Sequence, residues 1–171
     1  EKERIAYLNL LTMKPILYAL NRKSGGKNLD ELKDGRAERA YDLIKTLGGR
    51  YVFVDAATER ELNDVSDVDR AGFREELGVT EDGLASLIRG AYETLGLISF
   101  FTTGVVETRA WTIKRGWTAP EAGTAIHGDF KEKFVRAEVI NWQDLLDDGS
   151  IGHAREKGIL RTEGKEYIVK D

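Results

Sequence analysis

The sequence contains no cysteine, which excludes a disulfide framework, thiolate chemistry and a zinc–thiolate site. Its two histidines, His127 and His153, belong to no pattern with metal-ligand spacing, and we expect structural roles for both, His127 capping carbonyls at a helix end. No apolar run reaches the roughly 18 residues of a membrane-spanning helix, and the charged start EKER is not a signal peptide. We therefore expect no metal site, no membrane contact and a reducing, cytoplasmic environment.

Glycine motifs that bind phosphate are also missing. Neither GxxxxGKS, GxxxxGKT nor GxGxxG occurs, so these 171 residues hold no phosphate cradle and no candidate catalytic residue for phosphoryl transfer. The formal net charge of −4 excludes a generally basic coat. We therefore expect no sequence-specific DNA binding, and any contact with RNA must use a local patch.

The first residues predict a helix that lacks the usual start signals. In residues 1–11, Ile5, Leu8 and Leu11 recur at helical spacing, but neither methionine nor a capping residue precedes them. Pro15 then breaks the helix. We expect the chain to be part of a longer protein.

The first half has the pattern of an α/β domain. Residues 16–20, ILYAL, predict a strand buried on both faces of a parallel sheet. An amphipathic helix over residues 34–47 follows, ended by Gly48-Gly49, and then a second strand over residues 51–54. Further helices are expected at residues 70–77 and 82–97, the second stopped by Gly96.

The second half, after a boundary near residues 96–99, reads as a small α+β domain. Residues 97–113 predict one or two strands, and residues 109–130 a strand, a turn at Gly116 and a short helix started by Pro120. Residues 134–140 predict another strand. Two short helices are expected at 142–146, capped by Asn141, and at 150–157. Short strands are expected at 159–161 and 167–169, joined by a turn.

Two loops follow the strands of the first half at the edge where open α/β sheets bind ligands. Asn21 and Arg22 begin the first loop, and an amide side chain there offers donors and an acceptor to a purine base. The alternative is that Asn21 only starts a turn before Gly25-Gly26. In the second loop, Ala56 and Ala57 are small enough to let backbone amides approach a ligand. The alternative is a tight turn with Thr58 as helix N-cap.

A basic segment in the second half is the second candidate site. Residues 109–136 carry six basic against three acidic side chains, whereas residues 138–171 carry five against eight. Such a basic segment could dock on RNA or on an acidic protein surface. The alternative is a solvent-exposed face without a partner. Trp117, in the Gly116 turn, either stacks on a base or covers the core. The candidate residues are Arg109, Lys114, Arg115, Trp117, Lys131, Lys133 and Arg136.

Several stretches, in order along the whole chain, match one family. They are LNLLTMKPILYALN at residues 8–21, FFTTG at 100–104, ETRAWTI at 107–113, IH at 126–127, DF at 129–130, FVRAEVI at 134–140 and YIV at 167–169. On these residues the chain resembles the YchF subfamily of Obg-like P-loop ATPases. The resemblance implies an α/β, P-loop NTPase-type parallel sheet at residues 1–97, the carboxyl-terminal portion of an OBG-type nucleotide-binding domain. A β-grasp TGS domain without its closing strand follows at residues 98–171.

The resemblance also implies a function for the intact protein. It would be a ribosome-associated enzyme that binds ATP or GTP with Mg²⁺, and this chain alone would be inactive and bind neither tightly. Asn21 matches the first residue of the family's Asn-x-x-Glu base-recognition motif, but Ser24 stands at the position of its Glu, which leaves the choice between ATP and GTP open. Arg22, Ala56 and Ala57 fall in the loops beside the base. Ribosomal RNA or protein is the implied partner of the basic residues. The alternative is a non-catalytic TGS-type adaptor that binds RNA or protein.

Overall fold

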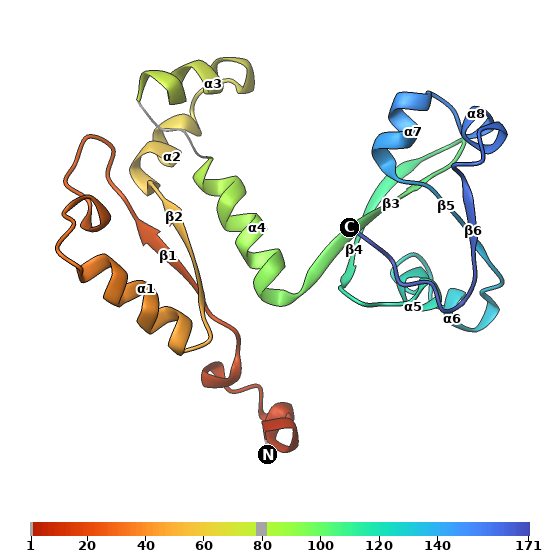
Figure 1. Cartoon of the computed structure of the whole chain (residues 1–171), viewed down its shortest axis with the longest axis horizontal. Helices are drawn as coiled ribbons and strands as arrows, with labels where there is room; N and C mark the ends of the chain where they lie inside the picture. Colours follow the sequence, from red (N-terminus) through yellow and green to blue (C-terminus); the bar gives the residue numbers. More distant parts are fainter. Residues whose placement is uncertain (1, 78–81) are drawn as a thin grey trace. The chain divides into compact units, whose positions relative to one another are not determined.

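A computed structural model describes residues 2–77 and 82–171, and Glu1 of the expected first helix lies outside these residues. The chain divides into two compact units, Glu1–Leu95 and Gly96–Asp171 (Figure 1). The first unit contains β1 (Leu17–Asn21), α1 (Arg36–Thr46), β2 (Arg50–Val54), α2 (Ala56–Leu62), α3 (Asp67–Glu76) and α4 (Gly83–Leu95), with short 3₁₀ segments at Lys2–Leu8, Leu11–Met13 and Leu29–Glu31.

The centre of the first unit is a parallel pair of strands between two helices. β1 and β2 pair from Leu17 opposite Arg50 to Asn21 opposite Val54, as the strand–helix–strand pattern predicted. On one face Tyr41 of α1 stacks on Tyr51 with ring centroids 4.7 Å apart. Val52 points to the opposite face because side chains alternate along a strand. There Gly90 of α4 lies so close that an added Cβ would approach Val52 to 2.8 Å.

The sequence overstated the burial of β1. Leu17, Tyr18 and Leu20 are only half-buried, Ala19 is exposed, and Ile16 precedes the strand and is 49% exposed. Within the described residues β1 pairs with β2 alone, so its other edge has no partner strand. A continuous apolar run therefore indicates the strand correctly but not how completely this chain encloses it.

The expected helix over residues 1–11 is also wrong. The segment forms two short 3₁₀ pieces, Lys2–Leu8 and Leu11–Met13. Its apolar side chains find no core, since Ile5, Leu8 and Leu11 are 42%, 49% and 82% exposed. Packing of an apolar face supplies most of the stability of a short helix, and that support is missing here.

The second unit combines a hairpin, short helices and a second strand pair. β3 (Leu97–Thr103) and β4 (Thr108–Lys114) are antiparallel, and β5 (Ala137–Val139) pairs antiparallel with β6 (Arg161–Glu163). The helices are α5 (Ala119–Gly123), α6 (Phe130–Lys133), α7 (Trp142–Asp148) and α8 (Ile151–Glu156). Buried Ile98, Ile113 and Ala122 form the core.

Helix starts in this unit follow the sequence signals. Thr118 and Glu121 form a capping box ahead of α5, and Pro120 stands in its first turn, as expected for residues 109–130. Asn141 caps α7 through a hydrogen bond from the Gln143 N–H, which confirms its predicted role. Capping depends only on neighbours in sequence, and this explains why it was predictable.

The short strands of the second unit differ from the strands that the sequence predicted. The expected strand 134–140 is reduced to β5, because Phe134 ends α6 and is buried. Residues 159–160 lie outside β6. The segment 167–169 does not pair with β6 but bridges back to the Gly116 turn, with Ile168 opposite Thr118. Strand partners far apart in sequence decided these boundaries.

Candidate functional site

The loops after β1 and β2 lie side by side and are tied together by two hydrogen bonds. Asn21 ends β1 opposite Val54, so the parallel register places the two loops at one edge. The Ala56 N–H donates to Asn21 Oδ1 over 3.1 Å. The Ser24 N–H donates to Asp55 Oδ2 over 2.6 Å. The residues that we expected beside a base, Asn21, Ala56 and Ala57, are exposed at this edge, with both alanines opening α2.

Asp55 has the most perturbed carboxyl group of this edge. Burial alone would raise the pKa of Asp55, but hydrogen bonds from Thr58 and Ser24 outweigh it and lower the pKa to about 2. One oxygen, Oδ1, accepts the Thr58 N–H at 3.1 Å, and the other, Oδ2, accepts the Ser24 N–H. Asp55 is thus the N-cap of α2, and the predicted cap, Thr58, is the buried donor instead.

Asn28 fixes the remainder of the first loop. Its Oδ1 accepts the Lys23 N–H at 2.8 Å, and its Nδ2 donates to the Lys23 carbonyl at 3.1 Å. Gly25 supplies the left-handed turn between them, with φ +66°. Asn28 in turn forms a capping box with Glu31. The loop is therefore a closed turn and not a free segment.

Arg22 does not reach the same place as Asn21. Its guanidinium lies 3.8 Å from the centroid of the Phe53 ring and forms an ion pair with Asp30. Phe53 itself contacts Tyr41 and Tyr51. Arg22 is thus held on the aromatic face that packs against α1, and a role at the base requires it to leave these contacts.

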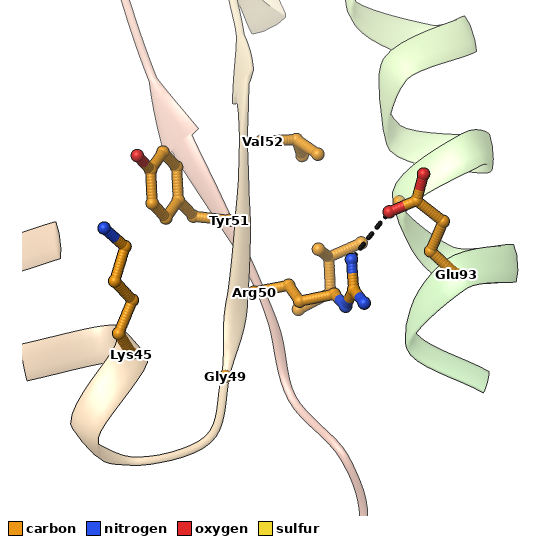
Figure 2. Close-up of a pocket in the computed structure, with 8 residues that line it drawn as sticks. Lys45, Gly49, Arg50, Tyr51, Val52 and Glu93 are labelled. Atoms are coloured by element: carbon orange, nitrogen blue, oxygen red, sulfur yellow. Dashed lines mark hydrogen bonds and ion pairs between the residues drawn. The ribbon is translucent and has the colours of Figure 1, made fainter. Parts of the chain in front are cut away.

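A pocket of about 250 Å³ opens at the other end of β2 (Figure 2). Gly49 and Arg50 line it, and Arg50 donates to Glu93 of α4 over 2.7 Å. Both side chains of this ion pair are more than half exposed. The pocket lies at the amino end of the strand, away from Asn21 and Asp55, and holds no converging set of buried polar groups.

The predicted basic residues of the second unit are exposed, but only some are free of partners. Arg109 lies 4.3 Å from the Trp111 ring centroid and 3.9 Å from a Glu107 oxygen. Lys133 pairs with Asp129. Within the described residues Lys114, Arg115 and Arg136 form no ion pair within 4 Å. These three and Lys131, for which the described residues show no ion pair either, are therefore the available cations of this set.

The packing of two further candidate residues, Trp117 and Lys131, bears on their predicted roles. Trp117 is half-buried against the Ile98–Ile113 core, which favours the covering role over a base-stacking one. Lys131 reaches the region of α5: the pKa of Glu121 is lowered first by hydrogen bonds from Thr118 and further by the Lys131 charge. Lys131 belongs to α6, which packs against α5, the helix that follows the Gly116 turn.

The histidines take no part in a metal centre within the described residues, where no cluster of three potential ligands occurs. His127 is exposed, and its Nδ1 accepts the Asp129 N–H at 3.3 Å, so it caps an amide and not a carbonyl as expected. No helix of residues 2–77 or 82–171 is both long and apolar enough to cross a membrane.

Comparison with known proteins identifies the relatives of this chain. Residues 97–171 match the family described as YchF-GTPase_C, a protein of unknown function (DUF933). The whole chain is 39% identical to the ribosome-binding ATPase YchF of Bacillus subtilis and 41% identical to that of Escherichia coli O157:H7, and spans 46% of the length of each. The structure of the Schizosaccharomyces pombe YchF GTPase matches 99% of the chain, with a TM-score of 0.80 and 32% identity, over 44% of its own length. Residues 97–171 therefore belong to the family of YchF carboxyl-terminal domains, and the whole chain is similar to the carboxyl-terminal region of YchF proteins.

Proposed function

We propose that the chain is the base-recognition and ribosome-docking part of a YchF-type ATPase. In this proposal residues 1–97 complete an OBG-type P-loop domain and residues 98–171 form a TGS domain of the β-grasp type. The relatives are named ribosome-binding ATPases, and a ribosome-bound enzyme works in the cytoplasm. ATP and Mg²⁺ would be held mainly by residues outside this chain, which has no phosphate cradle.

The hydrogen-bonding groups that the Asn21 side chain leaves free determine which base this edge prefers. Its Oδ1 already accepts the Ala56 N–H, and within the described residues its Nδ2 makes no hydrogen bond. Asn21 can therefore offer a donor, which suits N7 of either purine. The O6 acceptor of guanine needs a further donor, and the Ala56 N–H is already used, whereas adenine presents an N6 donor there. The edge thus favours ATP over GTP.

The nucleotide proposal is tested in the natural protein that contains this chain. Replacing Asn21 by alanine is expected to weaken ATP binding about tenfold, because one good base contact is worth about 1–3 kcal/mol. Equilibrium binding of ATP and GTP would be measured, with Asn141→Ala as a control at a cap in the second unit. Equal affinity of the wild type for both nucleotides would refute the adenine preference, and binding of neither would leave the adaptor function instead.

The second part of the proposal is a ribosome-facing surface around the Gly116 turn. Lys114 and Arg115 of this turn are exposed and unpaired within the described residues, and we add exposed Lys131 of α6, which packs against the helix after the turn. Ribosomal RNA, with its dense phosphates, is the partner that such cations suit best.

Reversal of these charges tests the surface. The variant Lys114→Glu, Arg115→Glu, Lys131→Glu is expected to co-sediment about tenfold more weakly with ribosomes, and its salt dependence should flatten by about one unit of slope for each lost phosphate contact. The matched control is Arg161→Glu, Lys165→Glu, Lys170→Glu, with the same charge change in the acidic half. Weaker binding without a flatter slope would indicate a ribosomal protein as partner, and unchanged binding would refute the surface.

A further inference from the structure

Asp55 is the residue of the base edge whose contacts exceed what its helix requires. An N-cap needs one acceptor for an amide of the first turn. Asp55 meets that need with Oδ1, which accepts the Thr58 N–H. Its second oxygen reaches out of the helix to the Ser24 N–H, 31 residues earlier in the chain, over 2.6 Å. That second bond contributes nothing to α2 itself.

The bond to Ser24 has a definite place in the loop. Asn28 closes the far side of the same turn by binding both backbone groups of Lys23. Asp55 holds the adjacent residue, Ser24, and Asn21 is held through the Ala56 N–H. The loop is thus fixed at three successive points, and the Asp55 bond is the one that joins its tip to the second strand's loop.

We propose that Asp55 is a positioning residue of the purine site, which ties the Ser24 loop to the start of α2 and so presents the Asn21 amide to the base. This inference rests on the proposed nucleotide function. It also accounts for Ser24, whose side chain cannot supply the carboxylate of an Asn-x-x-Glu motif. Here the Asp55 carboxylate, from the neighbouring loop, accepts the backbone N–H of Ser24 instead.

The hydrogen bond from the Ser24 N–H to Asp55 Oδ2 is called the clamp below. The electrostatics indicate that its carboxylate stays ionised. Although burial raises it, the pKa of Asp55 is lowered to about 2 by the hydrogen bonds from Thr58 and Ser24. The carboxylate therefore stays charged far below neutral pH, and charged acceptors form stronger hydrogen bonds than neutral ones. A neutral replacement should hold the loop less firmly.

The substitution Asp55→Ser separates the clamp from the cap. Serine is as good an N-cap as aspartate, so the Thr58 N–H keeps its acceptor. Its single, shorter hydroxyl cannot also reach the Ser24 N–H. We expect amide hydrogen exchange at Ser24, measured by NMR on this chain, to accelerate about tenfold, while exchange at Thr58 stays close to wild type.

The functional readout uses the natural protein that contains the chain. Asp55→Ser is expected to weaken ATP binding about tenfold, through loss of a hydrogen bond to a charged group. The control Asn141→Ser exchanges one capping residue for another at α7, which is in the second unit, and should leave both readouts unchanged.

Each outcome decides the proposal. Unchanged exchange at Ser24 in Asp55→Ser would show that the clamp does not order the loop. Faster exchange with unchanged ATP affinity would show a clamp with no effect on the base, and either result overturns the inference. If the wild type binds neither ATP nor GTP, the nucleotide function fails together with the positioning role, and the Ser24 exchange then shows whether the loop link exists without it.

Discussion

Replacing Arg74 by methionine is expected to destabilise the first unit by about 2 kcal/mol, between the cost of losing an exposed ion pair and that of breaking a fully buried one. Arg74 is 18% exposed and joins two helices, through Glu59 of α2 at 3.2 Å and Asp82, ahead of α4, at 2.6 Å. Glu59 is equally buried and also accepts the Gly83 N–H. Without Arg74 its charge is left with no cation beside it. We expect less than the cost of a fully buried pair because Asp82 is 42% exposed and can be solvated.

A matched variant distinguishes burial from charge. Arg50→Met removes the Arg50–Glu93 pair, whose side chains are 58% and 51% exposed. Exposed pairs contribute about 0–1 kcal/mol, so this control should change stability little. Urea unfolding followed by far-UV circular dichroism measures both variants. A loss below about 1 kcal/mol in Arg74→Met would contradict the assigned role of the cluster.

The pH dependence provides a second check. The hydrogen bond from Arg74 holds the pKa of Asp82 below the ordinary value of an aspartate. A carboxyl group with a lowered folded pKa stabilises the protein above its unfolded pKa, and this contribution is lost as the pH falls through the folded pKa. The difference between wild type and Arg74→Met should therefore be full near pH 7 and shrink as the pH falls below about 4.

Local signals in the sequence predicted the first unit well where neighbours in the chain decide the structure. The stripe of apolar residues gave α1, the Gly48-Gly49 pair its end, and Gly96, with φ +63°, the stop after α4. The parallel pairing of β1 with β2 followed from a strand–helix–strand pattern. The error was the helix at residues 1–11, whose apolar side chains have nothing to pack against in this chain.

The candidate site shows the opposite limit. Sequence reasoning placed Asn21 correctly at the end of a strand, but it named Thr58 as the cap and gave no role to Asp55 or Asn28. A capping signal was present, since Asp55 stands directly ahead of a helical segment. What could not be read was the contact with Ser24, because the distance between these residues depends on the register of β1 against β2.

The sequence also does not show which basic side chains are free to bind a ligand and which are held by contacts within the fold. Arg22 and Arg109 looked like ligand-binding residues by their place in the sequence. In the structure each guanidinium lies over an aromatic ring and near a carboxylate, Arg22 with Phe53 and Arg109 with Trp111. Cation–π contacts of this kind stabilise the fold by about 0.5–2 kcal/mol and remove these groups from the supply of free positive charge.

Replacing Ile113 by alanine is expected to destabilise the second unit by about 3 kcal/mol, within the roughly 2–5 kcal/mol found for truncating buried aliphatic side chains. Ile113 is 2% exposed, lies opposite Ile98 in the β3–β4 hairpin and contributes to the core with Ala122. The loss combines the transfer free energy of the missing carbons with the cavity left in a small core, which has few side chains able to fill it.

The three tryptophans make this prediction easy to measure, because Trp111, Trp117 and Trp142 all belong to the second unit. Denaturant unfolding followed by tryptophan fluorescence therefore reports on this unit. Ile168→Ala is the control, since this side chain is 54% exposed and its pairing with Thr118 uses the backbone; it should cost about 1 kcal/mol or less. Equal losses in the two variants would show that Ile113 does not carry the core.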